Sequence, residues 1–246
     1  MTNQEFSNEF DVLYNNISSN QAPGLDEYEK SVFLTKAQDE IIKNYFNPKG
    51  NKYQEGFDDS EKRQIDFSMI MRSTSITSGF TNGTFDTRSK IVELPRDVLM
   101  ILNEYAVVTR APSNVEGDTN SSTTLRLIVV PLEYKEYSRL MSKPFKRPLK
   151  FQAWRLLDNS NIIKKAEVIV GLNDTLDTYN IRYIKKPQAI ILSDLEGVTL
   201  DNKTNAQECE LDSILHQEIL QRAVELAKAA YVGDVNSSIE LGKRSE

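Results

Sequence analysis

Hydrophobic positions at the start of the chain repeat with the spacing of an amphipathic helix in two successive segments. Each segment opens with a capping box, formed by Thr2 with Glu5 and by Asp26 with Glu29. The apolar faces are Phe6, Phe10, Leu13, Tyr14 and Ile17 in the first segment and Tyr28, Val32, Ala37, Ile41 and Tyr45 in the second. Because a proline follows each segment, the pattern predicts two long helices joined by a short link.

Two further helices are predicted from the same periodicity. A short one begins near Asp59 or Ser60 and ends near Met71, and a longer one covers residues 212–231 with Gly233 as its C-cap. The apolar face of the longer helix consists of Leu215, Ile219, Ala223, Leu226, Ala227 and Ala230. Strong helical signals therefore lie near both ends of the chain.

Between these helices the pattern changes to short apolar runs separated by turn residues, which is typical of strands. Strands are predicted at residues 91–95, 105–109, 125–130, 151–157, 162–170 and 178–185. Residues 96–102 are predicted to form one helical turn, residues 132–141 a short helix, and Asn82-Gly83 a hairpin turn.

These elements predict an α+β chain. The N-terminal helices and the C-terminal helix would form a helical bundle, with residues 1–72 and 211–246 as one domain that includes a C-terminal tail. Residues 73–210 would form a β-rich insertion domain. Helices that bracket a sheet in this way can build a bundle that presents the sheet outward.

Composition supports a folded core but supplies little catalytic equipment. The chain has 246 residues, of which 39% are hydrophobic, and it contains one cysteine, Cys209, and one histidine, His216. A single cysteine excludes an intrachain disulfide framework, and no glycine-rich phosphate loop or nucleophile motif is present. We therefore predict no catalytic residue, no metal, no cofactor, and a protein that assembles rather than an enzyme.

No targeting or membrane segment is expected. The first residues lack the basic start and apolar run of a signal peptide. No apolar stretch reaches the roughly 18–20 residues that a membrane-spanning helix needs.

Charge is distributed unevenly along the chain, whose net charge is −6. Residues 1–46 and 194–218 are rich in acidic side chains, whereas residues 135–186 carry twelve basic against five acidic residues. The densest basic cluster contains Lys143, Lys146, Arg147 and Lys150. Three interpretations stay open for it: contact with phosphates, contact with an acidic partner surface, or a solvated loop. An acidic neighbouring subunit fits the segregation of charge.

Several segments, taken in order, resemble a known family. They are residues 24–31 (GLDEYEKS), 34–38 (LTKAQ), 92–95 (VELP), 129–132 (VVPL), 143–145 (KPF), 179–187 (YNIRYIKKP) and 209–219 (CELDSILHQEI). In this order they resemble the head-to-tail adaptor proteins of short-tailed phages, and most closely the virion ring proteins of crAss-like phages. The resemblance covers most of residues 2–232.

The resemblance implies a structural virion protein of the head-tail connector, or neck, that is assembled in the host cytoplasm. Such a protein forms a ring of about twelve copies, docks beneath the portal protein, extends the DNA channel and seats the next tail or neck ring protein. DNA would pass through the channel without sequence-specific binding, and no membrane would be involved. The alternative is a nucleic-acid-associated binding protein that uses the basic middle segment.

Candidate contact residues are part of this implication. The basic cluster would contact a neighbouring subunit or partner. The portal would be bound by the last helix and the tail, through Ala223, Ala227, Ala230, Tyr231, Lys243 and Arg244. The small alanine side chains would let another helix approach closely, although ordinary packing within the chain accounts for most such faces and is the preferred explanation for this helix.

Overall fold

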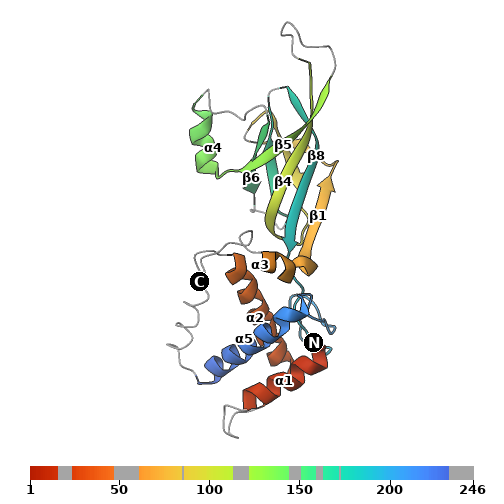
Figure 1. Cartoon of the computed structure of the whole chain (residues 1–246), viewed down its shortest axis with the longest axis vertical. Helices are drawn as coiled ribbons and strands as arrows, with labels where there is room; N and C mark the ends of the chain where they lie inside the picture. The colour runs from red at the N-terminus through yellow and green to blue at the C-terminus, as the bar shows by residue number, and fades with distance from the viewer. Residues whose placement is uncertain are drawn as a thin grey trace. The chain divides into compact units, whose positions relative to one another are not determined.

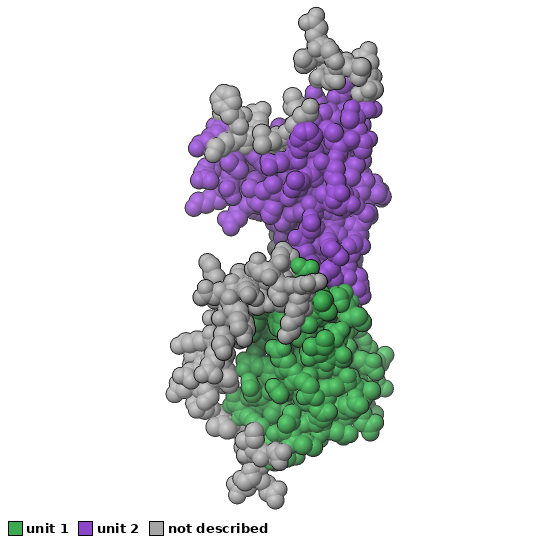
Figure 2. All heavy atoms as spheres, viewed as in Figure 1, with its two compact units in different colours: residues 1–70, 187–246 green, residues 71–186 purple. Residues whose placement is uncertain are grey.

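The computed structural model describes residues 1–15, 24–46, 61–84, 86–112, 122–143, 151–158, 163–171 and 173–232 (Figure 1). The chain divides into two compact units (Figure 2). The first contains residues 1–70 and 187–246, and the second contains residues 71–186.

The first unit contains four of the five α-helices in the described part of the chain: α1 (Asn3–Asn15), α2 (Glu27–Phe46), α3 (Glu61–Asp66) and α5 (Ser213–Val232). A 3-10 turn (Ser68–Ile70) comes after α3. Both predicted capping boxes are present. The Thr2 amide donates to the Glu5 carboxylate at 2.8 Å and the Glu29 amide to Asp26 Oδ1 at 2.7 Å. Helix α5 packs against α1 and α2, and Phe6, Phe10 and Ile219 are fully buried.

A polar stripe on α2 holds the extended segment that returns from the second unit. Ser31, Thr35 and Gln38 lie on one helical face because they are four and three residues apart. The Leu192 amide donates to Ser31 Oγ at 3.0 Å, the Ile190 amide donates to Thr35 Oγ1 at 3.1 Å, and Gln38 Nε2 donates to the Gln188 carbonyl at 2.9 Å. These side chains therefore take the place that a neighbouring strand would occupy for this backbone.

The second unit is built on one eight-stranded sheet with the order β1-β8-β4-β5-β6-β7-β3-β2. Its strands are β1 (Met71–Ile76), β2 (Thr81–Asn82), β3 (Ser89–Glu93), β4 (Val98–Arg110), β5 (Thr123–Pro131), β6 (Gln152–Asp158), β7 (Lys165–Ile169) and β8 (Asp174–Lys185). Neighbouring strands are antiparallel except β5 and β6, which run parallel. The remaining helix, α4 (Tyr134–Met141), lies in the connection between those two strands.

One face of the sheet encloses the main core. Buried residues from distant strands meet there, including Val92 of β3, Leu127 of β5 and Ile181 of β8. Since β3 and β8 lie near opposite edges of the sheet, the sheet must curl so that these strands approach each other. On the outer side, α4 covers β6 and β7 through a smaller cluster that contains Tyr137, Trp154 and Ile169.

The predicted fold class was wrong. The chain is a mixed α/β protein, not a helical bundle with a β-rich insertion: in its described part a curled eight-stranded sheet dominates and five helices accompany it. Residues 96–102, predicted as a helical turn, are mostly strand, because β4 begins at Val98. The stretch after Met71, for which no strand was predicted, forms β1 and β2.

Candidate functional site

The side of β1, β8, β4 and β5 that faces away from the core is hereafter the open face. Burial alternates along β4 and so separates the two sides of the strand. Glu104, Ala106 and Val108 are buried, whereas Asn103, which precedes them, is exposed and Tyr105, which lies between Glu104 and Ala106, is half-buried. This period of two is what a strand with one buried face requires. The sequence therefore places polar side chains outward on a strand whose other side packs in the core.

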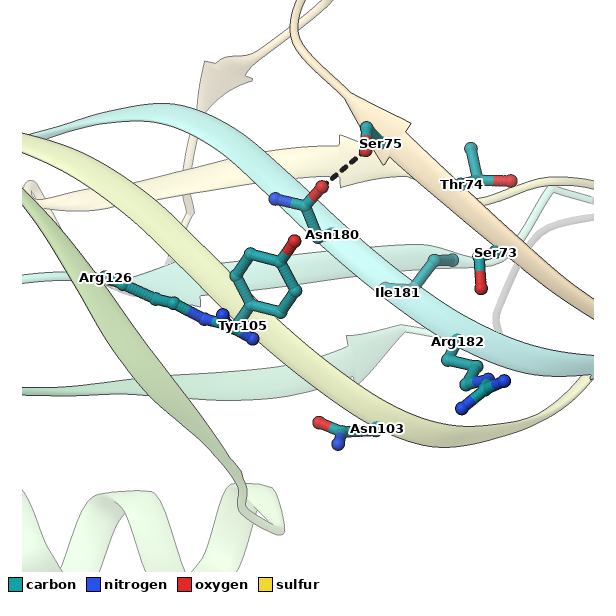
Figure 3. Close-up of a pocket in the computed structure, with 9 residues that line it drawn as sticks. All are labelled: Ser73, Thr74, Ser75, Asn103, Tyr105, Arg126, Asn180, Ile181 and Arg182. Carbon is teal, nitrogen blue, oxygen red and sulfur yellow. Dashed lines mark hydrogen bonds between the residues drawn. The ribbon is translucent and has the colours of Figure 1, made fainter.

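Side chains from four strands surround a polar hollow of about 270 Å³ on this part of the sheet (Figure 3). Its lining residues are Ser73, Thr74 and Ser75 of β1, Asn103 and Tyr105 of β4, Arg126 of β5, and Asn180, Ile181 and Arg182 of β8. Most of them carry a hydroxyl, amide or guanidinium group. The hollow therefore offers hydrogen-bond donors to whatever contacts it.

Strand register sets the order of these side chains. Asn180 pairs with Ser75 on one side and with Tyr105 on the other, and the Ser75 hydroxyl donates to Asn180 Oδ1 at 2.5 Å. Arg182, two residues further along β8, pairs with Ser73 of β1 on one side and with Asn103 of β4 on the other. The hydrogen bond fixes the Asn180 amide in place, so its nitrogen is directed away from Ser75 (Figure 3).

Two arginines give the open face its positive charge. The Arg126 guanidinium lies 3.6 Å from the centre of the Tyr105 ring, a cation–π contact. Arg182 is exposed on β8. Among the residues that the structure describes, neither guanidinium is paired with a carboxylate. Arg126 is held in place by stacking and keeps its donors available to a partner.

An apolar side chain borders the arginines. Ile128 pairs with Tyr105 in the β4–β5 register and is 68% exposed. Further along β5, Val130 packs in the cluster under α4. The helix thus covers the outer side of the sheet beyond Ile128. An exposed isoleucine beside tyrosine and arginine is a combination of residues that is common in protein interfaces.

Beneath the open face, a buried charge network crosses three strands. Arg155 Nε of β6 lies 2.9 Å from Glu104 Oε1 of β4, and the Tyr179 hydroxyl of β8 donates to the other Glu104 oxygen. Burial raises the pKa of the Glu104 carboxyl, and the Arg155 charge opposes that rise. The network ties together strands that are distant in sequence, and it lies on the core side, so we assign it a structural role.

The predicted basic cluster falls largely outside the described residues. Lys143 is exposed just after α4, where its amide donates to the Leu140 carbonyl at 3.0 Å. Lys146, Arg147 and Lys150 lie outside the described part of the chain. Their role as contact residues stays a prediction.

The predicted portal-docking residues are divided. Ala223 and Ala227 are buried within the first unit, and Ala230 is exposed near the end of α5. Tyr231 belongs to α5 by its backbone, whereas Lys243 and Arg244 lie outside the described residues. Ala223 and Ala227 therefore pack within the chain, and the contact of the last helix and tail with the portal stays a prediction.

His216 and Cys209 do not form a site. The His216 ring is buried against Phe6, with ring centroids 5.2 Å apart. The Cys209 thiol contacts Gln38 Oε1 at 3.6 Å, and burial raises its pKa to about 11. Within the described ranges, no three His, Cys, Asp or Glu side chains are grouped to hold a metal ion. None of the described helices is long and apolar enough to cross a membrane.

The sequence interpretation missed the open face. Arg126 stands between two leucines in the clearest predicted strand, and this alternation was a signal that it points away from the core. The other lining residues come from segments up to about a hundred residues apart, so no local pattern could have grouped them.

Comparison with known proteins finds similarity along nearly the whole chain. A family model described as phage tail ring protein 3/4 matches residues 1–238. The chain is 51% identical to "Ring protein 4/5" of Bacteroides phage crAss001 over the whole length of both chains. It is 32% identical to "Ring protein 3" of the same phage, with 92% of this chain and 95% of that protein covered.

Proposed function

Since this chain belongs to the phage tail ring protein family of crAss-like phages, we propose that it forms a ring in the head-tail connector. The ring docks beneath the portal protein, extends the DNA channel and seats the next tail component. Family membership itself makes the chain a structural component of the virion and not an enzyme. Its position in the connector and its partners are the proposed part.

The observation that carries this proposal is the 51% identity to a crAss001 ring protein across the full length of both chains. Identity over the entire chain extends to both compact units, so each unit is part of what the ring protein needs. The open face of the sheet supports the proposal, because it combines stacked arginine, tyrosine and exposed isoleucine without a covering element in the described residues.

Contacts of the basic side chains argue against the nucleic-acid alternative. Arg155 is paired with buried Glu104, Lys164 Nζ donates to the Val98 carbonyl at 2.6 Å, and Lys165 lies 3.3 Å from Glu93. Much of the described basic charge in residues 135–186 is therefore engaged within the sheet. Phosphate binding instead requires a cluster of available cations.

Electron cryomicroscopy of the full chain mixed with the portal protein of the same virus tests the proposal. A closed ring that shares the portal axis and caps its tail-side face is the expected result. If rings form but do not bind the portal protein, the ring belongs to another level of the tail. Failure to form rings under either condition would contradict the proposed connector role.

A further inference from the structure

We propose that the open face of one copy binds the acidic loop of residues 194–201 from a second copy of this chain. The inference rests on the proposed ring, and it names the two surfaces that join neighbouring subunits. The receiving surface belongs to the second unit and the inserted loop to the first unit of the next copy. Contacts between two different surfaces of identical subunits close into rings when the rotation allows it.

The receiving surface is positive and partly apolar. Arg126 and Arg182 border the hollow, and Tyr105 holds Arg126 by stacking at 3.6 Å. Ile128, next to Tyr105 on β5, is 68% exposed. A planar guanidinium binds a carboxylate through two parallel hydrogen bonds, so this surface favours an acidic segment that also carries an apolar side chain.

Residues 194–201 match that description. The loop exposes the carboxylates of Asp194, Glu196 and Asp201, with Val198 between them at 44% exposure. The next base along the chain, Lys203, donates to Gln188 Oε1 at 2.6 Å and to Gln207 Oε1 at 3.3 Å. The loop therefore carries net negative charge around one exposed apolar side chain, the inverse of the open face.

The loop is also held in shape before it binds. The Leu195 amide donates to the Thr204 carbonyl at 2.7 Å, and the Ala206 amide donates to Asp194 Oδ1 at 2.8 Å. Gly197 has a φ of 77°, a left-handed conformation that glycine adopts without strain. Because the turn is already formed, little conformational entropy is lost when it docks.

A charge exchange tests the pairing in the full-length protein. One variant carries Arg126→Glu and Arg182→Glu, and the other carries Glu196→Lys and Asp201→Asn, since asparagine tolerates the left-handed backbone of residue 201. Each variant alone should assemble with at least about tenfold weaker affinity than the natural chain. Mixed in equal amounts, the two should recover assembly, because the natural acidic loop of the first variant meets the natural positive face of the second, while the altered loop, whose net charge is now zero, meets the altered face without repulsion.

Mass photometry with and without portal gives the readout, and circular dichroism verifies that each variant is folded. If both variants assemble normally, the surface assignment is overturned while the ring proposal stands. If folded variants fail to assemble and their mixture does not recover, the open face binds a different partner. If the natural chain forms no ring under either condition, the proposed function fails together with this inference.

Disulfide cross-linking tests the same pair without changing charge. Ile128→Cys and Val198→Cys, introduced together, should yield covalent multimers on oxidation of the assembled ring. A matched control replaces Val198→Cys by Val12→Cys, which is also exposed, at 60%, but lies on α1. Multimers from the control at equal yield, or an intrachain bond in the test pair, would contradict the inference.

Discussion

His216 is a buried imidazole held between two polar groups of its own unit. Its Nε2 donates to the Leu211 carbonyl at 3.1 Å, and Nδ1 lies 2.7 Å from the Met1 amino nitrogen. Nδ1 therefore accepts, and the ring is neutral. Burial lowers the pKa of His216, and the positive Met1 amino group adds to that effect.

The His216 arrangement predicts a loss of stability in mild acid. The unfolded chain takes up a proton near pH 6.5, whereas the folded chain resists it, so the free energy of unfolding falls as the pH drops below about 6.5. Urea unfolding at pH 7.5 and 5.5 measures the effect. In His216→Gln the same drop in pH should cost less stability, and an unchanged pH dependence in that variant would refute this account.

Gly83 is required because there is no room for a side chain beside Glu167. A Cβ at this position would overlap Ser89 Oγ and Glu167 Oε1, two atoms that hydrogen-bond to each other in a buried site. The Gly83 amide also donates to the Ser89 carbonyl at 2.9 Å. Sequence analysis identified Asn82-Gly83 as a turn, but it could not show that the glycine serves a close approach between strands.

Gly83→Ala should destabilise the chain by about 2–4 kcal/mol, because it breaks the Ser89–Glu167 bond and leaves a buried carboxylate poorly satisfied. Denaturant unfolding measures this loss. Gly24→Ala is the control, since a Cβ there meets nothing within 4 Å. Equal stability of the two variants would mean that β2 and β3 separate at little cost.

At the scale of elements, local signals predicted the helices and strands β3 and β5 to β8, but missed β1, β2 and the first part of β4. The capping boxes of α1 and α2 involve residues three apart, so the sequence displays them directly. Strand β4 has register shifts against β8 between Val98 and Met100 and between Ile101 and Asn103. Each shift interrupts the alternation by which a strand is recognised, and for that reason residues 96–102 were predicted as a helical turn.

The α2 stripe gives a test at this scale. Thr35→Val removes the hydroxyl that binds both the amide and the carbonyl of Ile190, a fully buried residue. Unsatisfied buried backbone groups should reduce the free energy of unfolding by about 1–3 kcal/mol. Thr35→Ser keeps the hydroxyl and should lose far less, and calorimetry of the two variants checks the difference. A similar loss from both would point to methyl packing instead.

At the scale of the whole molecule, the family was recognisable although the fold class was not. Short motifs in a fixed order resemble those of ring proteins, and the family match covers residues 1–238, which include residues of both units. The curled sheet depends on pairings such as β1 with β8, about a hundred residues apart, which leave no periodic trace in the sequence. The open face could not be predicted from the sequence either, because its side chains come from four strands that are far apart in the chain.

The basic cluster is tested on the assembled protein. Replacement of Lys146, Arg147 and Lys150 by alanine should weaken ring assembly or portal binding, with a larger effect at low salt because dissolved ions screen attraction between charges at an interface. Sedimentation with and without portal measures both properties. Lys135→Ala with Arg139→Ala, exposed positions of α4, serves as the control. Intact assembly and intact portal binding would remove the cluster from the interface.

The pairing of β1 with β8 determines how the second unit responds to mechanical tension. The chain enters this unit at Met71 and leaves it after Lys186, two residues beyond Ile184, and Met71 and Ile184 face each other at one end of the ladder. A pulling force applied through both connections would act on the same end of the β1–β8 ladder. The hydrogen bonds between β1 and β8 would then break one after another from Met71 toward Ile76, and not all together as they would in shear. The sheet would then yield gradually at this edge, and the subunit could absorb strain before its core opens.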